Sequence, residues 1–162
     1  IPVILSKDQK VDYIKHIIRT QSEVKFINDL EDYLATSDNK FKEFDWWFFS
    51  KIDESLDEVY IPYYNPNANK ISYFYPDFIF WLKKGDDYLI VFVDPKGTEH
   101  TSYIRKIDGY REIFEEKGKE KILNYNGLKV KIKVRVRPDD ISKIPDLYRR
   151  YSFDKVEDML GG

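Results

Sequence analysis

Apolar residues recur every three or four positions in three segments of the chain, the spacing that gives a helix one apolar face. The first segment follows a capping box, Ser6-x-x-Gln9, and the third is followed by Gly118, a frequent helix stop. Two further short helical stretches are expected in the C-terminal tail, which also contains Pro138 and Pro145. The pattern therefore predicts helices over residues 7–19, 23–35 and 103–117.

Strands are predicted where aromatic and β-branched residues gather between turn sequences. Turn residues interrupt the region between the second and third helices at 52–57, 65–70 and 83–87. A final strand alternates apolar and basic residues without interruption. The order α-α-β-β-β-β-α-β-α indicates an α/β fold in one domain. The predicted strands cover residues 46–49, 58–64, 71–82, 88–93 and 128–137.

The length and composition of the chain agree with a single folded domain. A chain of 162 residues that is 42% hydrophobic can bury a core without disulfides, and this chain has no cysteine. No apolar run reaches the roughly 20 residues that a membrane helix needs, and no secretory signal opens the sequence. We therefore expect a cytoplasmic protein without a membrane partner. Because the chain starts at Ile1 and its only methionine is Met159, we also expect a domain excised from a longer protein.

Two aspartates stand at the ends of the apolar strands on either side of one turn. If that turn is centred on Gly85-Asp86, opposed residues have numbers that sum to 171, as those of Asp77 and Asp94 do. Directly opposed residues of an antiparallel pair share a face of the sheet. Lys96 lies two positions after Asp94 and therefore joins the same face.

Two carboxylates and a lysine at this position suggest a cation site. Close carboxylates repel each other unless a cation balances them. Carboxylate oxygens suit Mg²⁺ and Mn²⁺, and such an ion lowers the pKa of a bound water and stabilises charge on a phosphate. The spacing alone leaves a second interpretation open, in which Asp77, Asp94 and Lys96 form a solvated ion network at the end of the sheet.

The order and spacing of these residues resemble the PD-(D/E)XK nuclease superfamily. Pro76-Asp77 is followed, after a gap of sixteen residues, by Asp94-Pro95-Lys96. The flanking sequence is similar to the terminal endonuclease domain of type III restriction subunits and of helicase–nuclease fusions. The segments that carry this further similarity are 49–54, 60–63 and 76–81.

The resemblance implies a restriction-endonuclease-like αβββαβ core, in which helices flank a mixed central sheet. It covers residues 22–137. In a single nuclease domain over 1–162, residues 7–19 would then add an N-terminal helix, and residues 138–162 a helical C-terminal tail.

The resemblance also implies roles for the residues of the motif. Asp77 and Asp94 would be metal ligands, and the backbone carbonyl of Pro95 a further ligand. Lys96 would be the catalytic lysine. Mg²⁺ would be the cofactor, and Mn²⁺ would substitute for it.

Many members of the superfamily place a glutamate on the first core helix. Glu23 fits this position because it shares one stripe with Ile27, Leu30 and Leu34 and is the only charged member. Glu31 is the other candidate. An acidic residue in the first turn of a helix is also favoured by the helix dipole alone, so a purely structural role stays open.

Residues that would contact DNA are suggested by two further patterns. Some relatives carry Gln-x-x-x-Tyr on the helix after the lysine, and this chain has Lys106 and Tyr110 at that spacing, although Tyr110 also suits a packing position. The basic face of the last predicted strand could follow a phosphate backbone, or it could protect a sheet edge. Its residues are Lys129, Lys131, Lys133, Arg135 and Arg137.

The function expected from the sequence is that of a Mg²⁺-dependent DNA endonuclease, from a restriction or helicase-coupled defence enzyme. The formal net charge of −2 does not by itself indicate DNA binding, so we expect a fused or associated helicase or translocase to supply affinity. The alternative is a catalytically inactive nuclease-like module that binds DNA or a protein partner.

Overall fold

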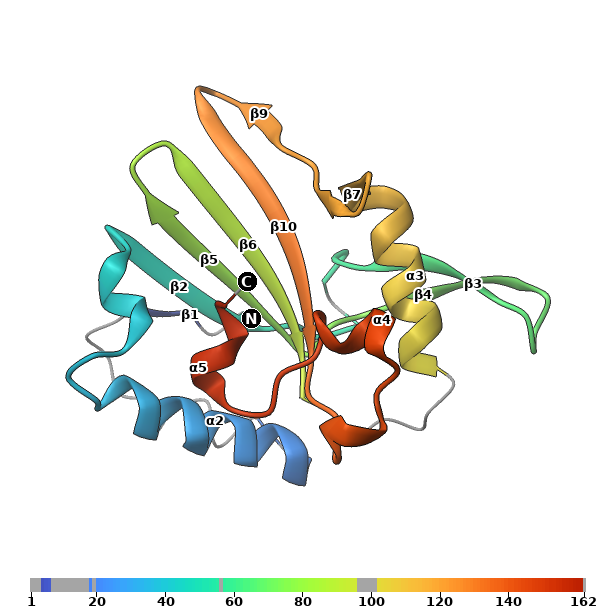
Figure 1. Cartoon of the computed structure of the whole chain (residues 1–162), viewed down its shortest axis with the longest axis horizontal. Coiled ribbons are helices and arrows are strands. Elements are labelled where there is room, and N and C mark those ends of the chain that lie inside the picture. The colour runs from blue at the N-terminus through green and yellow to red at the C-terminus, as the bar shows by residue number, and fades with distance from the viewer. Residues whose placement is uncertain (1–3, 7–17, 19, 56, 96–101, 162) are drawn as a thin grey trace.

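A six-stranded mixed sheet forms the centre of the protein (Figure 1). The computed structural model describes residues 4–6, 18, 20–55, 57–95 and 102–161. β10 runs parallel to β6, and every other neighbouring pair of the sheet is antiparallel. The α/β class and the mixed sheet predicted from the sequence are confirmed. In spatial order the strands are β1 (Ile4–Ser6), β2 (Trp46–Lys51), β5 (Phe78–Lys84), β6 (Asp87–Asp94), β10 (Leu128–Val136) and β9 (Leu123–Tyr125).

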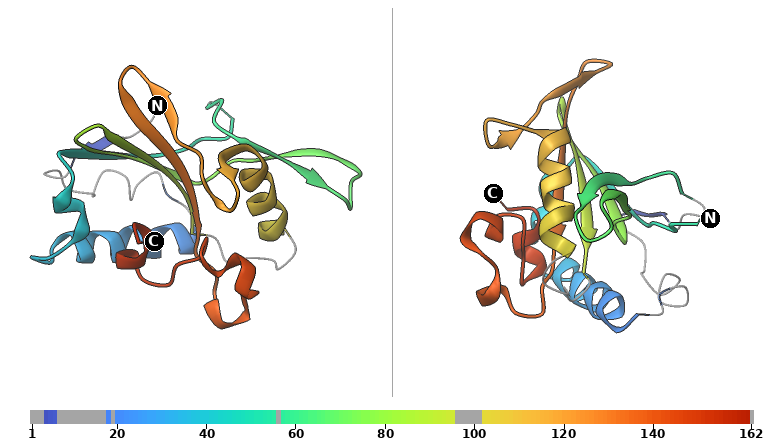
Figure 2. Two further views of the ribbon diagram at one scale, coloured as in Figure 1. Left: turned by 45° about the horizontal axis from the view of Figure 1, so that its top comes forward. Right: turned by 90° about the vertical axis from the view of Figure 1, so that its right-hand side faces the viewer.

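Helices cover both faces of this sheet (Figure 2). On one face, α2 (Gln21–Leu34) and the short α5 (Val156–Met159) pack on alternate residues of the strands, such as Phe80 and Val91. On the other face, α3 (Ser102–Phe114) packs on the intervening residues, such as Phe92. Because successive side chains of a strand point to opposite faces, the two cores lie on opposite sides of the sheet.

The strand predicted over residues 71–82 is in fact two strands, and this prediction was wrong. β4 (Lys70–Phe74) ends before Pro76, which has no N–H to donate to a strand partner, and β5 starts at Phe78. β4 instead pairs with β3 (Ile61–Asn65) in a separate two-stranded ribbon that extends away from the sheet (Figure 1).

Several short elements were not predicted. The helix expected over 103–117 ends at Phe114, where β7 (Glu115–Glu116) and β8 (Lys119–Glu120) form a small hairpin. β9 joins β10 through Asn126-Gly127, both with positive φ, a common hairpin turn. The helix predicted over 7–19 lies almost wholly outside the described residues. The tail contains two short α-helices, as expected, which are α4 (Asp146–Arg149) and α5. Two 3-10 helices complete the fold, η1 (Lys40–Glu43) after α2 and η2 (Ile141–Lys143) in the tail.

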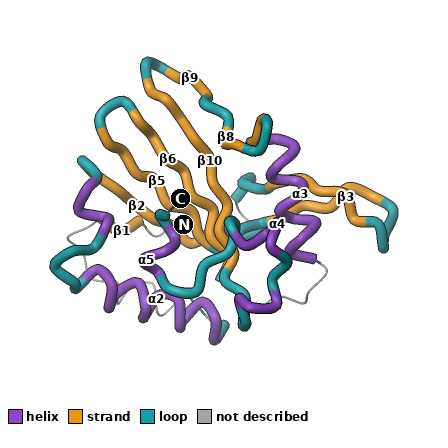
Figure 3. The backbone as a smooth tube through the Cα atoms, viewed as in Figure 1, coloured by secondary structure: helices purple, strands orange, loops and turns teal. Residues whose placement is uncertain are grey.

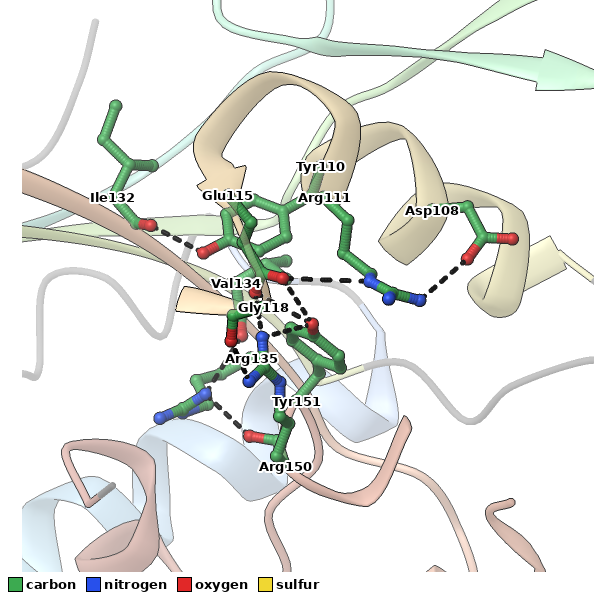
Figure 4. A network of polar contacts seen from close by, with 10 residues as sticks. All are labelled: Asp108, Tyr110, Arg111, Glu115, Gly118, Ile132, Val134, Arg135, Arg150 and Tyr151. Atoms are coloured by element: carbon green, nitrogen blue, oxygen red, sulfur yellow. Dashed lines mark hydrogen bonds and ion pairs between the residues drawn. The ribbon is translucent and has the colours of Figure 1, made fainter. Parts of the chain in front are cut away.

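A buried polar network attaches the C-terminal tail to the end of α3 (Figure 4). The Glu115 carboxylate accepts hydrogen bonds from the Tyr151 hydroxyl, at 2.8 and 2.9 Å, and from the Arg150 guanidinium. Arg135 of β10 is 5% exposed and donates to the backbone oxygens of Arg150, Met159 and Gly161. The tail is thus held by polar contacts as well as by its apolar side chains.

We predict that stability decreases as the pH rises above 10, in part through Tyr151. Burial and the hydrogen bond to Glu115 raise the pKa of Tyr151 to about 12, against about 10 in an unfolded chain. The folded state therefore holds the phenolic proton more tightly, and this contribution is present below pH 10 and is lost between pH 10 and 12. Measured by urea unfolding, the free energy of unfolding should fall less between pH 9 and pH 11 for Tyr151→Phe than for the wild type. Equal losses would contradict this assignment.

We also predict that Gly109→Ala destabilises the fold. A Cβ at this position would lie 2.5 Å from the Pro62 carbonyl oxygen and 2.7 Å from Cβ of Tyr63, because α3 packs directly on the backbone of β3. Although alanine favours helices by up to about 1 kcal/mol over glycine, we expect a net loss of about 1–3 kcal/mol from overpacking. Glu112→Ala, at an exposed position of α3, is the control and should not lower the thermal midpoint. A midpoint for Gly109→Ala at or above that of the wild type would refute the prediction.

Candidate functional site

The two aspartates lie at the same end of the β5–β6 hairpin, opposite its turn. Phe78 pairs with Val93 and Lys84 with Asp87, so paired numbers sum to 171, and the predicted register is confirmed. The next position beyond the last pair is Asp77 on one strand and Asp94 on the other. Figure 3 shows β5, β6 and β10 converging toward one end of the sheet and spreading toward their turns.

Backbone hydrogen bonds fix both aspartates in place. The carbonyl oxygen of Asp77 accepts from the Ile52 N–H at 2.8 Å, and that of Asp94 accepts from the Arg137 N–H at 2.9 Å. Each aspartate is therefore tied to a second strand or strand end. Both are buried, with 4% and 6% of their surface exposed.

Glu23 reaches the same end of the sheet from the first turn of α2. It shares the buried face of the helix with Ile27 and Leu30, as the sequence predicted. Glu31, the other candidate, lies eight residues further along, or about 12 Å at 1.5 Å per residue. Glu23 is consequently the glutamate of α2 that contacts this end of the hairpin.

Lys51, the last residue of β2, joins Glu23 to Asp77. Its Nζ atom lies 3.2 Å from Oε1 of Glu23 and 3.3 Å from Oδ1 of Asp77. The same ammonium lies 5.5 Å from the centre of the Phe78 ring. Three elements, α2, β2 and the start of β5, thus meet at one lysine.

Asp94 pairs with a different lysine. Nζ of Lys106, on α3, lies 3.6 Å from Oδ2 of Asp94 and 4.7 Å from the centre of the Phe74 ring. Lys106 was expected to contact DNA, and the structure places it beside the candidate site. The acidic cluster, by which we mean Glu23, Asp77 and Asp94, is therefore balanced in part by Lys51 and Lys106.

The cluster is an unfavourable environment for the charge on Glu23. Burial raises the pKa of this carboxyl, the charge of Asp77 raises it further, and Lys51 lowers it. The fold therefore opposes ionisation of Glu23, and the ammonium of Lys51 offsets only part of that cost.

Within the described part of the chain, no group of three or more acidic or histidine side chains is close enough to hold a metal ion. Two carboxylates do converge on one cation, because Glu23 and Asp77 both contact the ammonium of Lys51. Hard carboxylate oxygens are also the donors that Mg²⁺ prefers. These two residues fit part of a divalent metal site, whereas Asp94 is directed to Lys106. Pro95 is buried, and Lys96 lies outside the described residues.

Two of the residues expected to bind DNA have structural contacts instead. Tyr110 is 1% exposed and its hydroxyl donates to the carbonyl oxygen of Ile132 at 2.7 Å, so it packs α3 on β10. The guanidinium of Arg135 is buried and already donates to the carbonyl oxygens of the tail. Neither side chain is accessible to a phosphate in this conformation, so neither is assigned to DNA binding here.

The other basic residues of β10 become more exposed with distance from the acidic cluster. Lys133 is partly buried, and burial lowers its pKa. Lys129 is exposed, but in the β6–β10 register it lies opposite Asp87, near the hairpin turn. At 3.3 Å per residue, this position is about 23 Å from Asp94 at the other end of β6. β10 has β6 on one side and β9 beside Leu128–Val130 on the other, so edge protection does not explain Lys129. Lys131 lies between these two lysines and is partly exposed, and Arg137 pairs with Asp29 at 2.6 Å.

Lys51 was missed in the sequence analysis as a site residue. A signal was present, because Trp47, Phe49 and Lys51 alternate along β2 and the first two point into the core beneath α2. A lysine that continues a buried aromatic stripe needs a counter-ion. The sequence alone did not show which carboxylates would supply it.

We predict that Glu23→Gln stabilises the protein at neutral pH. The pKa of Glu23 is raised from 4.5 in the fold, so the folded state binds this proton more tightly than the unfolded state. The resulting contribution to the free energy of unfolding is fully present below pH 4.5 and is lost as the carboxyl ionises at higher pH. Glutamine removes that penalty, and we expect the thermal midpoint to rise by about 2–4 °C at pH 8, with a smaller gain at pH 4. Asp32→Asn, on the exposed face of α2, is the control. A lower midpoint for Glu23→Gln at pH 8 would show that the ion pair with Lys51 outweighs burial.

Comparison with known proteins identifies a family and nothing further. No helix in the described ranges is long and apolar enough to cross a membrane. No curated protein and no solved structure matches the chain. The family model that matches is that of the YagJ family, over residues 14–152, a span that includes all three acidic residues of the cluster. The chain belongs to the YagJ family.

Proposed function

We propose that this chain is a metal-dependent DNA endonuclease domain of the PD-(D/E)XK type. The observation that carries the proposal is the convergence of Glu23 and Asp77 on one cation at the end of the hairpin that also bears Asp94. Glu23 belongs to α2, Asp77 directly precedes β5 and Asp94 ends β6, an arrangement that agrees with the superfamily motif. The sequence Pro76-Asp77…Asp94-Pro95 stands in the order that the motif requires.

The succession of elements supports the same proposal. α2, β2, β5, β6, α3 and β10 follow one another in the order helix, three antiparallel strands, helix, parallel strand. This is the order of the proposed restriction-endonuclease-like core, with the β3–β4 ribbon inserted between its first and second strands. The N-terminal strand β1 and the C-terminal tail would be additions to that core.

Under this proposal, Glu23 and Asp77 would hold Mg²⁺, or Mn²⁺ in its place, and Asp94 and the carbonyl of Pro95 would complete the site once Asp94 leaves Lys106. The bound ion would supply a water of lowered pKa and neutralise charge on the phosphate. The buried carboxylates contribute hard oxygen donors held by the backbone of β5 and β6. Lys96 would stabilise the charge that builds on the phosphate, a role that rests on the motif alone.

The proposed DNA contacts are the lysines that remain accessible. Lys106 is nearest to the acidic cluster, and its side chain is 24% exposed. Lys129, Lys131 and Lys133 would contact the phosphate backbone further along β10. With a net charge of −2, the chain has no general attraction to DNA. We therefore include in the proposal a cytoplasmic helicase or translocase, fused or associated, that brings DNA to the site.

A second function is favoured by the lysine contacts of the cluster. Lys51 and Lys106 pair with carboxylates that a nuclease would direct to metal, as in a nuclease-like module that binds DNA or a protein without cleaving it. The motif residues stand in the order that a nuclease requires, and this favours the nuclease, because a binding module has no chemical need for that set of residues. Cleavage distinguishes the two functions.

We predict that the protein nicks or linearises supercoiled plasmid in Mg²⁺ or Mn²⁺ at low salt, and that EDTA abolishes this activity. Asp77→Asn, Asp94→Asn and Lys96→Ala should each reduce the cleavage rate at least about 100-fold, because each removes a group proposed to act at the reacting phosphate. Asp87→Asn, at the opposite end of β6, is the matched control and should retain the wild-type rate. Cleavage that persists at the normal rate in Asp77→Asn or Asp94→Asn would exclude the assigned site.

A further inference from the structure

We propose that Lys51 is an internal counter-ion that competes with a divalent metal for Glu23 and Asp77. In the described conformation its ammonium occupies the cation position between these two carboxylates, so a metal binds there only when Lys51 moves away. This inference rests on the proposed function, and it adds a means by which the chain itself controls occupancy of the site.

The geometry distinguishes Lys51 from the other lysine of the cluster. Nζ of Lys51 is within 3.3 Å of both carboxylates, whereas Nζ of Lys106 lies 3.6 Å from one carboxylate of the described residues, that of Asp94. Glu23 and Asp77 come from elements that are far apart in the sequence, and Lys51 contacts both. Only 21% of its side chain is exposed, so the ammonium is within the cluster and not above it.

The ammonium of Lys51 and a divalent metal ion cannot occupy this position together, for electrostatic reasons. An ammonium and a divalent ion that shared the same two carboxylate oxygens would repel each other at contact distance, and burial weakens the solvent screening of that repulsion. Removing the charge of Lys51 leaves two buried carboxylates close together, and a divalent ion then relieves their mutual repulsion. The affinity for metal is therefore expected to rise when the ammonium is removed.

The lysine side chain also provides a way for the site to open. Its four-carbon stem is flexible, and its ammonium can bind phosphate as well as carboxylate. A phosphate of bound DNA that draws Lys51 outward would leave Glu23 and Asp77 available to metal. Metal and DNA would then strengthen each other's binding, as linkage requires.

The first test is calorimetric titration of the whole chain with Mn²⁺. We expect Lys51→Met to bind Mn²⁺ at least about 10-fold more tightly than the wild type, and Lys51→Arg, which keeps the charge, to bind it no more tightly. Lys25→Met is the matched control, because Lys25 is on α2 two residues after Glu23 but has a side chain that is 70% exposed and pairs with Asp29. It should bind Mn²⁺ as the wild type does. A folded Lys51→Met variant with unchanged or weaker affinity would overturn the proposal.

The second test uses only the wild-type chain and does not depend on whether a variant folds. Acylation of lysines, read by mass spectrometry, should label Lys51 several-fold faster in saturating Mg²⁺ than in EDTA, with Lys25 as the internal reference. Equal labelling of Lys51 in the two conditions would overturn the proposal.

Plasmid cleavage, measured on the same preparations, separates this proposal from the proposed function. A wild type that cleaves DNA while Lys51→Met shows no gain in metal affinity would refute the role of Lys51 and leave the nuclease standing. Tighter metal binding by Lys51→Met, in a protein that never cleaves, would support the role of Lys51 and refute the nuclease.

Discussion

The register of the β5–β6 hairpin is the constraint on which the rest of the site depends. Side chains alternate between two buried faces along both strands, so a slip of one residue would exchange the core beneath α2 with the core beneath α3. The turn holds the register, because Gly85 adopts a φ of +58° that glycine accepts without strain. Asp77 and Asp94 are therefore brought to one end of the sheet by the turn and by apolar packing along the whole length of both strands.

The acidic cluster is a place where stability and chemistry oppose each other. Burial and the charge of Asp77 both raise the pKa of Glu23, so the fold gains nothing from ionising this group. Two lysines from separate elements offset the negative charge, one at the end of β2 and one on α3. The lysines thus offset part of the negative charge gathered at this end of the sheet, and under the proposed function the same carboxylates would hold metal.

The surrounding structure holds the elements of the site at fixed positions. Close packing at Gly109 sets α3, and with it Lys106, against the β3–β4 ribbon. An ion pair of 2.6 Å between Arg137 and Asp29 joins the end of β10 to α2. The network around Glu115 and Arg135 then attaches the tail beside α5, which packs on the same core as α2. Both helices of the cluster are thus braced by contacts outside it.

The sequence by itself determined the local elements and one long-range relation. Helical spacing located α2 within two residues, and the turn centred on Gly85-Asp86 predicted which residues of β5 and β6 are paired. Both depend on periodicity and turn chemistry, which are local properties. Tertiary structure alone decided that Lys51 lies between Glu23 and Asp77, that Tyr110 is buried, and that Arg135 binds the tail. These contacts join residues that are 22 to 28 positions apart, and they follow from how the helices and the tail pack on the sheet, which no local pattern specifies.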